Sequence, residues 1–140
     1  MKYTSNSPEQ TKKVGYELAK ALAADGRRYV ALRGEMGVGK TAFTAGFCSF
    51  FEVSTVKSPT YTVMNEYRGN GATVYHFDMY RITDGDDLYS IGYDDYLDSG
   101  AYILVEWSEN IPDYIPEDAV TVTIERCDSS ESDRIITVEL

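Results

Sequence analysis

Residues 29–41 read YVALRGEMGVGKT, and this stretch joins a short apolar run to a glycine-rich loop. An uninterrupted run such as Tyr29-Val30-Ala31-Leu32 is typical of a strand that is covered on both faces in a parallel sheet. The loop satisfies the pattern G-x-x-x-x-G-K-[ST] in full and carries a third glycine, Gly37. The stretch therefore predicts a strand, a phosphate-binding P-loop and a helix, in that order.

The P-loop predicts how ATP would bind. Its glycines let successive backbone N–H groups turn toward the phosphates, and the helix behind it presents the positive end of its dipole. Lys40 would reach the β- and γ-phosphates, and the Thr41 hydroxyl would ligate the Mg²⁺ that bridges them. A chance glycine turn is the alternative, but the flanking strand and helix argue against it. The residues expected at the nucleotide are Glu35, Met36, Gly37, Val38, Gly39, Lys40 and Thr41.

Two helices flank the predicted strand at 29–32. The first begins at a capping box, Ser7-Pro8-Glu9-Gln10, and ends at 25–26. The second begins near Lys40, and both should pack on a sheet. The apolar face of the first carries Val14, Leu18, Ala21 and Leu22, and the stripe of the second carries Phe43, Phe47, Phe50 and Phe51.

The rest of the chain reads as strands with one helical stretch. Strands are predicted over 63–67, 73–77, 102–105, 120–124 and 135–138, with a hairpin at 69–71 and a helix over 86–97 that Gly92 interrupts. Alternation in the last strands suggests antiparallel pairing at a sheet edge. We expect one α/β domain over 1–140: a three-layer P-loop NTPase fold with a mostly parallel central sheet, an antiparallel hairpin and C-terminal edge strands.

Charge and composition limit the possible functions. The 140 residues carry a net charge of −10, which disfavours independent binding to nucleic acid or anionic lipid. This acidity serves solubility or offers a face to a basic partner. The two cysteines lack the spacing of a zinc or redox site, and no apolar run approaches the about 20 residues of a bilayer span. We expect a cytoplasmic protein without membrane contact.

Two carboxylates end predicted strands, where P-loop proteins place acids that act on the metal. Glu106 follows the run 102–105, and Asp78 follows the strand at 73–77. Which of them touches Mg²⁺ first stays open, because Asp78 could instead hold the second shell or orient the attacking water. His76, the only histidine, is interpreted as structural, and Trp107 as a packing residue whose indole would report on a bound ligand.

The loop after the second helix contains Ser58-Pro59-Thr60-Tyr61-Thr62. P-loop enzymes often keep a segment there that senses the γ-phosphate, so Thr60 and Thr62 could change conformation with the nucleotide. An ordinary turn is the alternative, because Ser-Pro-Thr is a common turn sequence.

Four blocks of this chain together resemble the bacterial TsaE family, also called YjeE. They are GEMGVGKT at 34–41, SPTYT at 58–62, HFDMYR at 76–81 and LVEW at 104–107, and their order and spacing agree with the family over most of the chain. The resemblance implies an ATPase that supports threonylcarbamoylation of tRNA together with TsaB and TsaD, of which TsaD is the transferase. It implies that tRNA is held by these partners and not by the ATPase.

The resemblance also implies roles for individual residues. Lys40 would bind the phosphates, Thr41 and Glu106 would bind Mg²⁺, Thr60 would sense the nucleotide, and Asp78 would act in hydrolysis. Trp107 would lie at the edge of the site. Adenine contacts would come from residues 7–11, including Ser7, and from Ser132-Asp133-Arg134.

Two other functions fit the same P-loop. A small-molecule kinase would use Asp78 as the base that deprotonates an acceptor hydroxyl, although the chain shows no arginine-rich lid. A nucleotide-gated binding module would keep Lys40 and Thr41 but would hardly hydrolyse ATP. The kinase predicts a phosphorylated product, whereas the module predicts neither a product nor much free phosphate.

Overall fold

The apolar run after residue 28 forms the central strand of the protein, β2 (Tyr29–Arg33). In the computed structural model, which describes residues 1–35, 37–53, 63–82, 84–128 and 130–140, this strand is buried on both faces. Val30 and Leu32 join one hydrophobic cluster, and Tyr29 and Ala31 join another on the opposite face. The strand therefore separates two cores, as its uninterrupted apolar sequence predicts.

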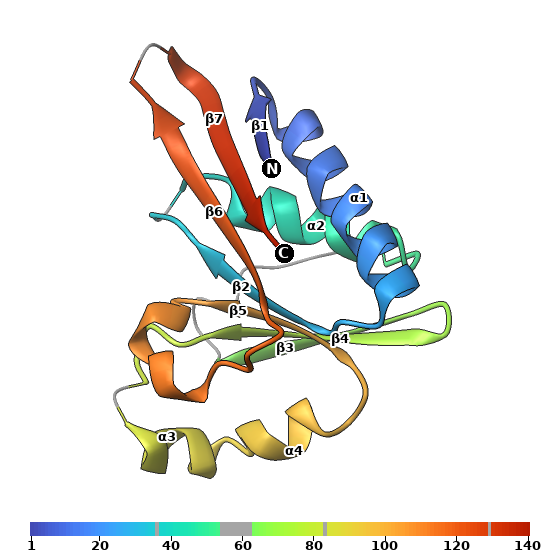
Figure 1. The fold of residues 1–140 in the computed structure, drawn as a ribbon, viewed down its shortest axis with the longest axis vertical. Helices are drawn as coiled ribbons and strands as arrows, with labels where there is room; N and C mark the ends of the chain where they lie inside the picture. Colours follow the sequence, from blue (N-terminus) through green and yellow to red (C-terminus); the bar gives the residue numbers. More distant parts are fainter. Residues whose placement is uncertain (36, 54–62, 83, 129) are drawn as a thin grey trace.

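The described residues form a seven-stranded sheet in the order β1-β7-β6-β2-β5-β4-β3 (Figure 1). Its centre is parallel, because β2 pairs with β5 and β6, and β4 pairs with β5. The pairs β3–β4, β6–β7 and β1–β7 are antiparallel. The strands besides β2 are β1 (Lys2–Ser5), β3 (Met64–Gly69), β4 (Ala72–Asp78), β5 (Tyr102–Glu106), β6 (Val120–Cys127) and β7 (Ser130–Glu139).

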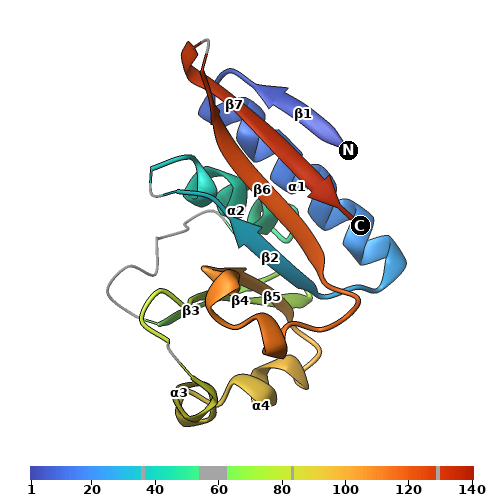
Figure 2. The same ribbon diagram turned by 60° about the vertical axis from the view of Figure 1, so that its left-hand side comes forward.

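Helices cover both faces of this sheet, so the fold has the three predicted layers (Figures 1 and 2). On one face lie α1 (Pro8–Asp25) and α2 (Lys40–Ser49), and on the other lie α3 (Gly85–Ser90), α4 (Tyr93–Leu97) and two 3₁₀ turns, η1 (Ser108–Asn110) and η2 (Pro112–Tyr114). The first two helices cross closely at Gly46, where a Cβ atom would collide with the Lys12 carbonyl. This crossing brings the start of α1 toward the P-loop.

Most predicted elements are confirmed, with small shifts of boundary. The Ser7 hydroxyl caps α1 by accepting from Gln10 N at 3.2 Å, and the hairpin turns at Asn70 and Gly71. The helical stretch is broken as predicted, because Gly92 has a φ of 75° and becomes the N-cap of α4. The fold class read from the sequence is therefore correct.

Three details of the prediction are wrong. Ala21 is exposed, because the buried face of α1 runs through the small residues Gly15 and Ala19, which contribute little to an apolar pattern. Helix α2 ends at Ser49, so Phe50 and Phe51 pack after it instead of on its stripe.

The third error concerns position alone: the antiparallel pairing predicted for the C-terminal strands is confirmed between β6 and β7, but their place at the sheet edge is wrong. Strand β6 is an inner strand, parallel to β2, and β7 is covered by the unpredicted strand β1. Main-chain pairing with β7 is the chief interaction that orders β1, because Ser5 is the single buried residue of that strand. A polar segment of this kind carries no hydrophobic signal for a strand.

Candidate nucleotide-binding site

The P-loop joins the carboxyl end of β2 to the start of α2. Its glycines Gly34, Gly37 and Gly39 have φ values of 152°, 73° and 120°, a region that other residues rarely adopt. A Cβ atom on Gly34 would lie 2.7 Å from the Ile124 carbonyl oxygen, so β6 restricts this position to glycine. The N-cap of α2 is Gly39, which makes no side-chain cap, and the first N–H groups of the helix can therefore donate to an anion.

Lys40 lies at the centre of the site although it is 94% buried, with 6% of its surface exposed. Its ammonium donates to the Gly34 carbonyl at 2.7 Å and lies 3.4 Å from Glu106 Oε1. It also lies 5.2 Å from the centre of the Trp107 ring. The P-loop cation and the strand-end carboxylate, which the sequence separates by more than sixty positions, are thus an ion pair.

Glu106 has a second partner on the neighbouring strand. Its Oε2 lies 2.5 Å from His76 Nε2, and the imidazole is fully buried. Burial acts to raise the pKa of the Glu106 carboxyl, but the hydrogen bond from His76 and the charges of His76 and Lys40 outweigh it and lower that pKa. Glu106 is therefore a buried carboxylate that stays ionised.

Asp78 lies opposite Glu106 in the β4–β5 register, so the two carboxylates end adjacent parallel strands. Its Oδ1 accepts from Tyr80 N at 2.9 Å. The pKa of Asp78 is raised, chiefly because the carboxyl is partly buried. The hydrogen bond from Tyr80 lowers this pKa, and the charge of Glu106 raises it further. The two acids therefore share one edge of the sheet but have opposite pKa shifts.

The predicted nucleotide residues Thr41 and Trp107 also lie at this edge. Thr41 is exposed in the first turn of α2. Trp107 is half-buried with a left-handed φ of 59°, and its ring contacts that of Tyr80 at a centroid distance of 5.0 Å. The exposed Thr41 hydroxyl and the strand-end carboxylates could together offer oxygen ligands to Mg²⁺.

The predicted adenine-binding segments approach the P-loop from two sides. From α1, the Thr11 methyl carbon lies 3.9 Å from where a Cβ on Gly39 would be, and Ser7 caps that helix. From β7, Arg134 Nε donates to the Val38 carbonyl at 2.9 Å, and Asp133 precedes it on the same strand. Both segments thus border the nucleotide loop, although their contacts with a base stay a prediction.

Sequence reasoning missed Arg126, which holds the outer side of the loop. Its guanidinium donates to the Gly37 carbonyl at 3.5 Å and lies 4.0 Å from a Glu35 carboxylate oxygen. No local pattern could reveal this contact, because it depends on the pairing of β6 with β2. Two predicted site residues, Met36 and Thr60, lie outside the described residues, as does Thr62.

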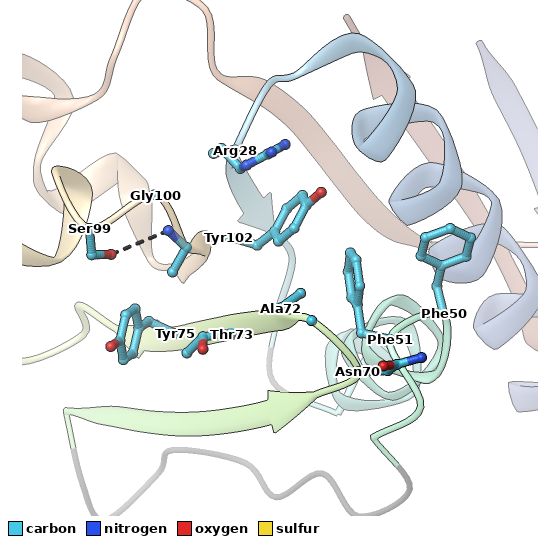
Figure 3. Close-up of a pocket in the computed structure, with 12 residues that line it drawn as sticks. Arg28, Phe50, Phe51, Asn70, Ala72, Thr73, Tyr75, Ser99, Gly100 and Tyr102 are labelled. Carbon is cyan, nitrogen blue, oxygen red and sulfur yellow. Dashed lines mark hydrogen bonds between the residues drawn. The ribbon is translucent and has the colours of Figure 1, made fainter.

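A separate cavity of about 510 Å³ lies at the opposite end of the sheet (Figure 3). It opens at the amino ends of β4 and β5, where Arg28 stacks over the Tyr102 ring at 4.4 Å and Phe51 packs beside it. Ligands of open α/β sheets bind at the carboxyl ends of the strands, and this cavity has no glycine-rich phosphate loop. We therefore place the candidate site at the P-loop and not in the cavity.

None of the helices that the structure describes combines the length and apolar character of a bilayer span.

Comparison with known proteins links this geometry to one family. Residues 5–136 match the family described as "Threonylcarbamoyl adenosine biosynthesis protein TsaE". Two relatives named "tRNA threonylcarbamoyladenosine biosynthesis protein TsaE" are similar to this chain. The one from Rickettsia conorii is 34% identical, and the match covers 92% of this chain and 73% of the relative. The one from Haemophilus influenzae is 38% identical, and the match covers 76% of this chain and 68% of the relative.

A solved structure agrees with the sequence matches. The crystal structure of Bacillus subtilis YdiB superposes with a TM-score of 0.74 at 29% identity and covers 99% of this chain and 83% of that one. The likeness extends over the whole sheet and its helices, so it includes both the P-loop and the strand ends that carry Asp78 and Glu106.

Proposed function

This chain belongs to the TsaE family, and on that premise we propose that it hydrolyses Mg-ATP in the threonylcarbamoyladenosine modification of tRNA. One observation carries the proposal: Lys40 of the P-loop is paired with Glu106 at the carboxyl end of the adjacent strand. ATP hydrolysis by a P-loop protein uses a cation on the phosphates and a carboxylate on the metal, and this pair brings both groups to one place.

The residues present fit ATP and Mg²⁺. The positive φ angles of the loop glycines leave the backbone free to approach phosphates, and the uncapped start of α2 offers N–H donors. Thr41 and Glu106 would hold Mg²⁺, and Lys40 would bind the β- and γ-phosphates. When bound, the metal supplies positive charge to the phosphate oxygens.

Asp78 is the candidate for positioning the attacking water. Its Oδ1 accepts from the Tyr80 N–H, which restrains the carboxylate, and among the described residues Oδ2 stays available to accept a hydrogen bond from water. Its raised pKa makes it a better proton acceptor than an ordinary aspartate once ionised. These features support a role in hydrolysis and do not require a second substrate, as the kinase alternative would.

We further propose that the ATPase acts with a TsaB–TsaD pair and meets tRNA only through these partners. The net charge of −10 supports this division of labour, because an acidic chain repels the phosphate backbone. Nucleotide binding would set the conformation of the Thr60 segment, and that conformation would govern docking.

Phosphate release from Mg-ATP tests the proposal. It is measured for the wild type and for Lys40→Ala, each with and without a purified TsaB–TsaD pair, and Lys13→Ala on the exposed face of α1 is the matched control. We expect slow release alone, faster release with the pair, loss of release in Lys40→Ala and normal release in Lys13→Ala.

Two results would contradict parts of the proposal. Release that persists in Lys40→Ala would show that the P-loop does not carry the activity. If the TsaB–TsaD pair does not change phosphate release, the ATPase proposal holds but the proposed partners are wrong. A phosphorylated small molecule among the products would then support the kinase alternative.

A further inference from the structure

We propose that His76 is a positioning residue for Glu106: its imidazole binds one carboxylate oxygen and thereby directs the other toward the P-loop. The inference rests on the proposed function, because Glu106 is the metal ligand that would be positioned. It assigns a role to the only histidine of the chain, which lies on β4 two residues before Asp78.

The geometry divides the two oxygens of Glu106 between different partners. Oε2 lies 2.5 Å from His76 Nε2, whereas Oε1 lies 3.4 Å from the Lys40 ammonium. Strands β4 and β5 are parallel neighbours with His76 opposite Leu104, so the imidazole approaches the carboxylate from the adjacent strand. The backbone of both strands is fixed by the sheet, and the contact therefore restricts rotation of the carboxylate.

The hydrogen-bond pattern indicates that this contact is the main polar role of the imidazole. An ionised carboxylate only accepts hydrogen bonds, so Nε2 must carry the proton and donate. Within the part of the chain that the structure describes, the buried Nδ1 atom has no hydrogen-bond partner. A buried histidine that serves only packing could be replaced by an apolar ring, and leaving Nδ1 unsatisfied costs stability. The contact with Glu106 gives a reason for retaining it.

Removal of the donor has a specific consequence for the site. Without His76, both oxygens of Glu106 are free to turn toward the ammonium of Lys40, which lies within reach of Oε1 already. A two-oxygen contact would neutralise Lys40 more fully and leave fewer carboxylate lone pairs for a metal ion. Residues that orient metal ligands commonly change metal affinity by about 10- to 100-fold when they are replaced.

The test uses His76→Phe, which keeps a buried ring but removes the donor, and His76→Gln, which restores an N–H donor. Calorimetry measures the affinity for adenylyl imidodiphosphate with Mg²⁺ and with EDTA. We expect His76→Phe to lose about tenfold or more of the affinity gained from Mg²⁺, with a smaller change in EDTA. His76→Gln should recover part of the gain.

Phe77→Leu is the matched control, because the next residue on β4 is equally buried but faces the other core. It should lower thermal stability without changing the gain from Mg²⁺. If His76→Phe behaves like Phe77→Leu, the inference is overturned while the proposed function stands. If the wild type gains no affinity from Mg²⁺, the proposed metal-dependent function fails and the inference with it.

Discussion

Glu106 receives a hydrogen bond from one strand and an ionic contact from the P-loop, and these neighbours hold its carboxyl ionised despite burial. A single change of charge at this residue would therefore act on the proposed metal site without removing the side chain's volume. Because Trp107 follows directly and lies beside Lys40, its emission should report nucleotide binding in the same experiment.

Glu106→Gln removes the charge and keeps an oxygen acceptor. We expect the Mg²⁺ concentration for half-maximal phosphate release to rise by about tenfold or more, while nucleotide binding without metal changes less. A Mg²⁺ titration at saturating ATP measures this, with Trp107 emission as the parallel record of binding. Glu109→Gln, an exposed neighbour, is the control. An unchanged Mg²⁺ midpoint in Glu106→Gln would argue against metal ligation.

The positions of the site residues could be predicted from sequence more fully than their partners. A glycine-rich loop after an apolar run locates Lys40, and an acid at the end of a strand locates Asp78 and Glu106. The contact between His76 and Glu106 needs the order and register of β4 and β5, which no local pattern contains. For this reason sequence reasoning gave His76 only a structural interpretation.

At the scale of elements, a chain of hydroxyl groups joins β2 to the helices on one face of the sheet. Tyr29 and Tyr93 hydroxyl oxygens lie 2.7 Å apart, and Tyr93 donates to the Tyr114 carbonyl at 2.8 Å, so Tyr29 is the donor to Tyr93. Burial raises the pKa of Tyr29 far above its usual 10.0 and that of Tyr93 to about 12. Both hydroxyl groups thus stay protonated in the folded protein at pH values where a free tyrosine ionises.

This pair predicts a loss of stability in alkali. The pKa values of both tyrosines are raised in the folded protein. Their contribution to the free energy of unfolding is therefore complete below pH 10.0, where the unfolded tyrosines are also protonated, and it falls as the pH rises toward about 12. Tyr29→Phe should cost about 1 kcal/mol at neutral pH and should flatten the alkaline decline. Urea unfolding at pH 7 and at several pH values above 10 measures both effects.

Tyr89→Phe is the control for this prediction, because its side chain is 86% exposed. It should keep the stability and the alkaline decline of the wild type. An equal decline in Tyr29→Phe and the wild type would mean that the buried pair does not govern unfolding in alkali.

The elements that sequence located best are those whose own side chains form the core. Strand β2 has a continuous apolar run, and Gly92 splits a helical pattern as its left-handed φ requires. Strand β1 escaped prediction because its order comes from pairing with β7 and not from burial of its side chains. The inner position of β6 was missed because alternation does not distinguish a parallel from an antiparallel neighbour.

At the scale of the whole molecule, the balance of 23 acidic against 13 basic side chains dominates the long-range field. We expect this chain alone to retain no tRNA in a filter-binding assay at low salt, where such contacts would be strongest. Retention should require the TsaB–TsaD pair, which is the positive control when assayed by itself. Retention of tRNA by the isolated chain would contradict the proposal that it meets tRNA only through partners.

The arginines of the C-terminal hairpin carry a consequence for biosynthesis. Arg126 and Arg134 follow their P-loop acceptors, Gly37 and Val38, by 89 and 96 positions. Ribosomes synthesise a chain from its amino end, so the P-loop emerges long before the two arginines that donate to its carbonyls. A nascent chain would thus gain these two outer contacts of the loop only after β6 and β7 have been made, which ties completion of the proposed phosphate site to synthesis of that hairpin.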